Sequence, residues 1–72
     1  MENTMETRNG IIIKICSNRG YGFIQDNERQ TLFFHVSEVI EPNFKELKKG
    51  MKVEYLQVTT PKGEKAIKIV KI

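Results

Sequence analysis

The amino-acid sequence predicts an all-β fold, a small closed barrel of five short antiparallel strands. Five runs rich in β-branched and aromatic residues are separated by turn-forming residues, a pattern typical of all-β barrels and sandwiches. Helical periodicity is almost absent. At 72 residues the chain has room for one domain, and a barrel is favoured because closure removes exposed strand edges.

The first three strands are expected to form an antiparallel meander. The β-branched run 10–16 is followed by the turn residues 17–20, which suggests a strand and a reversal. The second strand is expected over 21–26. A polar hairpin loop, 26–30, then leads into the third strand, 31–36.

A long connection is expected after the third strand. Ser37 can cap a short helical turn, and Pro42 stops any long helix close by. Phe44 and Leu47 are the apolar anchors of this connection, which ends at the charged turn 48–50.

The last two strands are predicted over 52–59 and 65–72. The first of them carries alternating Val53 and Tyr55, which is typical of a strand with one buried face. The residues 60–63, Thr-Pro-Lys-Gly, form a strong turn signal between the two strands. The folded domain is therefore expected over 10–72, after a polar and flexible tail over 1–9.

Composition and charge restrict the class of protein. A net charge of +3 and a pI near 9.2 favour an anionic partner, although only weakly. Cys16 is the only cysteine, so an intramolecular disulfide is excluded and a reducing, cytoplasmic location is expected. The longest aliphatic run, 11–13, is far too short to span a membrane, and 1–9 lacks the apolar stretch of a secretory signal.

Alternation in the second and third strands predicts two chemically different faces. One face carries aliphatic and aromatic core residues, namely Ile24, Leu32 and Phe34. The other face carries flat rings, namely Tyr21, Phe23, Phe33 and His35. Because neighbouring strands bring these rings together, and because every nucleobase offers a face for stacking, the ring-bearing face is predicted to bind unpaired bases.

Basic residues and glycines accompany this face. Arg19 precedes the second strand and can contact a phosphate or stack on a base. Lys14 and Lys62 are further candidates for phosphate contacts. Gly20 and Gly22 allow the strand to bend and leave the neighbouring rings clear.

Some of these residues allow other interpretations. Phe44 lies in a connection, so its ring either extends the stacking face or only pins the loop. A lone His35 cannot build a metal site, and Cys16 has no obvious partners for nucleophilic catalysis, so no metal, cofactor or enzymatic activity is expected. The lysines of the last strand do not share one face and are interpreted as a solvated edge that discourages aggregation; they are Lys65, Lys68 and Lys71.

The runs 19–24 (RGYGFI) and 32–35 (LFFH) resemble the two ribonucleoprotein-like motifs of the cold-shock domain family. The resemblance extends without gaps over about 10–72. It implies a five-stranded oligonucleotide-binding (OB) fold, and a stacking platform of Tyr21, Phe23, Phe33, His35 and Phe44. Family members typically carry Trp-Phe-Asn where this chain has residues 14–16 (Lys-Ile-Cys), and often an aromatic residue where it has Val36.

The resemblance implies a function in binding single-stranded RNA or DNA, as an RNA chaperone or a regulator of transcription or translation. Because rings are missing, the affinity should be more than tenfold lower than that of a fully aromatic relative. A monomer is expected, without a small-molecule substrate, cofactor or membrane. The rival hypothesis is a protein-interaction module on the same barrel, in which Ile13 extends an apolar patch.

Overall fold

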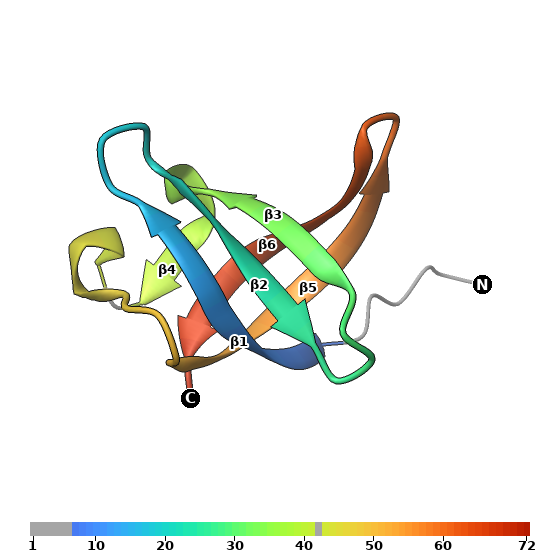
Figure 1. Cartoon of the computed structure of the whole chain (residues 1–72), viewed down its shortest axis with the longest axis horizontal. Coiled ribbons are helices and arrows are strands. Elements are labelled where there is room, and N and C mark those ends of the chain that lie inside the picture. The colour runs from blue at the N-terminus through green and yellow to red at the C-terminus, as the bar shows by residue number, and fades with distance from the viewer. Residues whose placement is uncertain (1–6, 42) are drawn as a thin grey trace.

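The protein is an all-β barrel, as the sequence predicts. The computed structural model describes residues 7–41 and 43–72. In these residues, six strands and two single-turn 3₁₀ helices occur in the order β1 (Thr7–Cys16), β2 (Tyr21–Asp26), β3 (Thr31–His35), η1 (Val36–Glu38), β4 (Val39–Glu41), η2 (Phe44–Glu46), β5 (Lys52–Thr60) and β6 (Gly63–Lys71) (Figure 1). Over the same residues, no helix has the length and hydropathy that a membrane crossing requires.

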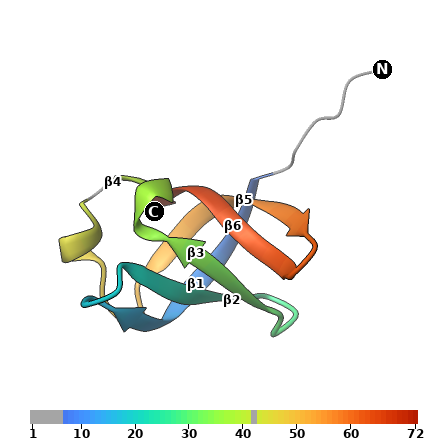
Figure 2. The same cartoon turned by 90° about the horizontal axis from the view of Figure 1, so that it is seen from above.

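The five long strands form one sheet that closes on itself. The strand order is β3-β2-β1-β5-β6-β4, and an additional pairing of β3 with β6 completes the barrel (Figures 1 and 2). The pairs β1–β2, β2–β3, β1–β5 and β5–β6 are antiparallel. The closing pair β3–β6 and the short pair β4–β6 are parallel, so the barrel is mixed rather than purely antiparallel.

Two boundaries differ from the sequence-based expectation. Strand β1 begins at Thr7, because Thr7–Gly10 pair with β5; these residues belong to the barrel, whereas the rest of the predicted tail lies outside the described residues. Strand β3 ends at His35, because Val36 begins the 3₁₀ turn η1.

The long connection also contains more structure than its sequence indicated. Its first turn, η1, is capped by the side chain of His35 rather than by Ser37. The short strand β4 follows, pairing with β6, and was not predicted because only that distant partner orders it. Pro42, the predicted helix stop, lies outside the described residues.

The core lies inside the barrel and is built from alternate residues of every long strand. On the β2–β3 hairpin, the predicted core residues are all 0% exposed, which confirms the alternation. Val53 and Tyr55 of β5 are buried as well. The full buried cluster consists of Ile12, Ile24, Leu32, Phe34, Leu47, Val53, Tyr55, Ala66 and Ile69.

A β-bulge at Ile13 determines which β1 side chains face outwards. Ile12 pairs with Ile24, but the next pairing residue is Lys14, so Ile13 is the extra residue. As a result both Ile12 and Ile15 contact the core, although they are an odd number of residues apart. Lys14 is left exposed on the outer face of the sheet.

Candidate nucleic-acid interface

Three aromatic rings form a continuous cluster on the outer face of β2 and β3. Tyr21 and Phe33 have ring centroids 5.6 Å apart at an interplanar angle of 31°. Phe23 meets Tyr21 at 5.8 Å and Phe33 at 5.9 Å, in both cases edge to face. These separations lie in the favourable range for aromatic pairs, so the rings hold one another in place. We call Tyr21, Phe23 and Phe33 the aromatic triad.

The register of the hairpin places the triad there. Phe23 pairs with Phe33 across the two strands, while Tyr21 pairs with His35. Residues paired in this way point to the same side of the sheet. The triad is half-buried to exposed, with Phe33 37% exposed, so its rings remain accessible while their edges are supported.

His35 ends β3 and has a fixed orientation. The backbone N–H of Ser37 donates to its Nδ1 atom at 3.1 Å, and Ser37 Oγ lies 2.9 Å from the same nitrogen. Because a backbone N–H can only donate, the neutral imidazole carries its proton on Nε2. The exposed ring thus both caps η1 and presents an N–H group beside Tyr21.

Strand β1 extends this face with polar side chains instead of rings. Lys14 pairs with Phe23, and Cys16 pairs with Tyr21. The Cys16 thiol, first through a hydrogen bond and then through its charge, raises the pKa of the Tyr21 phenol, and the charge of Arg19 opposes this shift. Cys16 is a half-buried free thiol.

The turn between β1 and β2 is held against the end of β3. Gly20 adopts a φ of 72°, a left-handed conformation that suits glycine, and its N–H donates to the Cys16 carbonyl. The Gly20 carbonyl accepts a hydrogen bond from Val36 N–H at 2.8 Å. Arg19 is exposed in this turn, at the His35 end of the aromatic triad.

Phe44 lies apart from the triad. Its ring contacts the core ring of Phe34, with centroids 6.3 Å apart at an angle of 66°. It is half-buried and borders a shallow hollow with Val36, Asn43 and Lys45. Its contacts therefore include the loop-pinning role, and its outer edge faces this hollow beyond β3.

The β5–β6 hairpin brings further residues to the opposite side of the triad. Phe33 and the residues 60–65 line a predominantly apolar hollow of about 610 Å³. Lys62 is exposed at its rim, as the sequence prediction requires. Lys65, interpreted from the sequence as part of a solvated edge, instead pairs with Phe33. Only the closing β3–β6 pair reveals this position.

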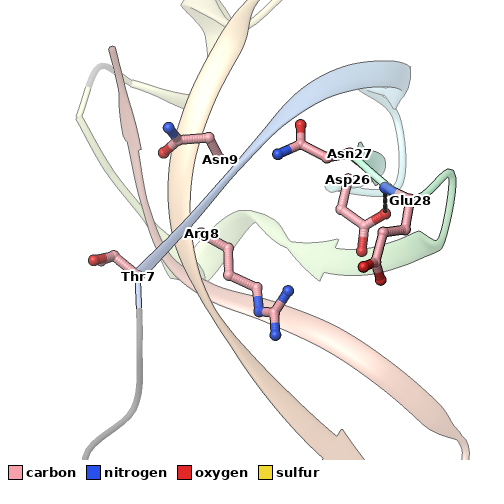
Figure 3. A pocket seen from close by; sticks show the side chains of 6 residues that line it. All are labelled: Thr7, Arg8, Asn9, Asp26, Asn27 and Glu28. Carbon is pink, nitrogen blue, oxygen red and sulfur yellow. Dashed lines mark hydrogen bonds between the residues drawn. The ribbon is translucent and has the colours of Figure 1, made fainter.

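A second hollow at the far end of the barrel is polar. It is lined by Thr7, Arg8, Asn9, Asp26, Asn27 and Glu28 (Figure 3). Asp26 is buried there, and its Oδ1 atom accepts hydrogen bonds from the backbone N–H groups of Glu28 and Gln30, both at 2.8 Å. These bonds close the β2–β3 loop. Among the described residues, no group of three His, Cys, Asp or Glu side chains could hold a metal ion.

Comparison with known proteins is consistent with this geometry. The family model of the 'Cold-shock' DNA-binding domain matches residues 8–72. Cold shock protein 1 of Lactiplantibacillus plantarum is 30% identical over 63 residues, which cover 88% of this chain and 96% of that protein. Cold shock-like protein CspC of Bacillus cereus is 30% identical over 56 residues, 78% of this chain and 86% of the relative.

Staphylococcus saprophyticus cold shock protein CspA is 28% identical over 65 residues, covering 90% of this chain and 98% of the relative. The matches therefore span nearly the whole barrel, including the aromatic triad and the β5–β6 hairpin. On this evidence, the chain belongs to the cold-shock domain family.

Proposed function

We propose that this protein binds single-stranded RNA or DNA by stacking unpaired bases on the aromatic triad, with His35 at one end. The observation that carries the proposal is the cluster of three rings on the outer face of the sheet, with centroids 5.6 to 5.9 Å apart. The core on the inner face of the same strands is already complete. Rings on the outer face are therefore not required for the core.

The expected affinity comes from stacking and from charge. Each stacked base contributes roughly 1 to 3 kcal/mol, and because all bases stack, little sequence preference results. Lys14, Arg19 and Lys62 are proposed to contact phosphates, so binding should weaken as salt is raised. Phe44 is proposed as an additional stacking position at the edge, reached through the hollow beside Val36.

The biological role follows from binding unpaired strands. A protein that binds only the open form of a hairpin shifts the pairing equilibrium by mass action, without ATP. We therefore propose an RNA chaperone or a regulator of transcription or translation, acting as a monomer in the cytoplasm. Its partner is a single strand rather than a small molecule. Domains of this DNA-binding family are not enzymes, in agreement with the sequence prediction.

A titration followed by amide NMR tests the proposal. A short oligothymidine is added at low and at moderate salt to the wild type, to Phe33→Leu and to Ile40→Ala. The last variant is the control, because Ile40 is also exposed and apolar but lies on β4, away from the triad. Wild type and control should show shifts centred on the triad, while Phe33→Leu loses roughly fivefold or more in affinity.

The same titration distinguishes the rival function. If the wild-type resonances stay unmoved at millimolar oligonucleotide, base stacking is wrong, and a protein-interaction module becomes the better hypothesis. Ile13, the residue on which that hypothesis draws, is half-buried at the β1 bulge. It therefore offers only a small apolar surface.

A further inference from the structure

A single row of paired residues crosses the outer face of the barrel. Lys14 on β1 pairs with Phe23 on β2, and Phe23 pairs with Phe33 on β3. Through barrel closure, Phe33 pairs with Lys65 on β6, which pairs in turn with Val58 on β5. The row therefore places two aromatic rings between two lysines.

The side chain of Lys65 lies on the same outer face as the rings. Its neighbour Ala66 is 0% exposed and belongs to the core. Because side chains alternate along a strand, Lys65 must point away from the core. It lines the hollow beside Phe33, in agreement with this orientation.

The two lysines are too far apart to contact one phosphate. Strands in a sheet are spaced by about 4.8 Å, so three strand spacings separate Lys14 and Lys65 by about 14 Å along the sheet. Each can contact a phosphate on its own side of the two rings. A single strand running across the strands, along this row, would meet a cation, two stacking rings and a second cation.

One negative charge lies close to this path. The carboxylate of Glu64 lines the same hollow as Lys65. Both of its oxygens are already engaged by β5: Gln57 Nε2 donates to one at 2.9 Å, and Thr59 Oγ1 donates to the other at 2.9 Å. These bonds reduce its repulsion of a phosphate, while Lys62 at the rim adds a positive charge.

We propose that Lys65 is a phosphate-binding residue, and that the single strand extends across the β3–β6 seam into the hollow beside Phe33. This proposal rests on the proposed function, since it extends the same site. It places the strand perpendicular to the barrel strands, with bases on Phe23 and Phe33. Lys65 is then part of the binding site and not of a solvated edge.

The test measures how oligothymidine affinity depends on salt in wild type, Lys65→Gln and Lys71→Gln. Lys71 is the matched control, because it is an exposed lysine on the same strand, about 20 Å further along it. Each phosphate contact on a single strand contributes about 0.7 to the slope of log affinity against log salt. Lys65→Gln should lower this slope by about 0.7, whereas Lys71→Gln should leave it unchanged.

The outcomes separate this inference from the proposed function. If the wild type binds and both variants keep its slope, or both lower it equally, Lys65 makes no local contact and the inference is wrong. If the wild type does not bind at all, the proposed function itself fails. Far-ultraviolet circular dichroism and thermal unfolding of each variant confirm that the barrel is intact, so that a lost slope reports on binding.

Discussion

The ring of Phe34 occupies the space into which a side chain on Gly22 would project. The two residues are cross-strand partners, and a Cβ atom built on Gly22 would lie 2.7 Å from Phe34 Cζ and 2.6 Å from the Lys14 carbonyl oxygen. The glycine between two rings of the triad is thus required by the core beneath it. The same close approach keeps β1, β2 and β3 in the register that aligns the rings.

Gly22→Ala should therefore destabilise the barrel by about 3 kcal/mol, since neither the backbone oxygen nor the packed ring can move away cheaply. Urea unfolding measures the loss. Gly50→Ala is the matched control: Gly50 has a φ of 95° but nothing within 4 Å of the added Cβ, so it reports backbone strain alone, about 1 kcal/mol. Equal losses for the two variants would contradict the steric explanation.

Lys14→Trp should strengthen binding of oligothymidine by about fivefold or more, because position 14 is exposed beside Phe23 and a ring there adds one stacking site. The natural chain has no tryptophan, so the new indole is also a specific fluorescent probe. Its emission should be quenched on binding. Lys48→Trp, in an exposed turn, should bind like the wild type without quenching, and quenching in both would argue against a local platform.

Phe44→Ala should reduce stability more than it reduces binding. The ring contacts Phe34 and is half-buried, so its removal should cost about 2 kcal/mol, less than for a fully buried ring. Thermal unfolding and an oligothymidine titration are compared with those of Phe33→Ala, whose ring is more exposed and more important for binding. If Phe44→Ala loses as much affinity as Phe33→Ala, Phe44 is a full member of the platform.

Tyr55 should make the barrel sensitive to alkali. Burial, and then the negative charge of Asp26, raises the pKa of its phenol above the ordinary value, while Arg8 opposes this. Below about pH 10 the phenol is neutral in both the folded and the unfolded state, so it has no effect. As the pH rises above 10, only the unfolded state releases the proton readily, and stability falls.

Urea unfolding at pH 8 and at pH 10.5 measures this loss. Tyr55→Phe should abolish most of it, and Tyr21→Phe, which changes an exposed phenol, should retain it. At neutral pH, Tyr55→Phe should cost little, because the buried hydroxyl makes no hydrogen bond with the described residues. An unchanged alkaline loss in Tyr55→Phe would assign the effect to other groups.

The sequence alone determined the all-β class and the arrangement of the β2–β3 hairpin. In a hairpin, the pairing register follows from a short loop and from strict alternation, both of which are local. For this reason alternation correctly assigns Tyr21 and Phe23 to the outer face, and Ile24 and Phe34 to the core, without any knowledge of the distant strands.

Only the tertiary structure decided which residues of the other strands join this face. The bulge at Ile13 breaks the alternation of β1, so the exposure of Lys14 beside Phe23 cannot be deduced from spacing. Lys65 reaches Phe33 through the parallel closing pair of strands β3 and β6, which are distant in the sequence. Such contacts depend on the closure of the whole barrel, and no local pattern of residues encodes them.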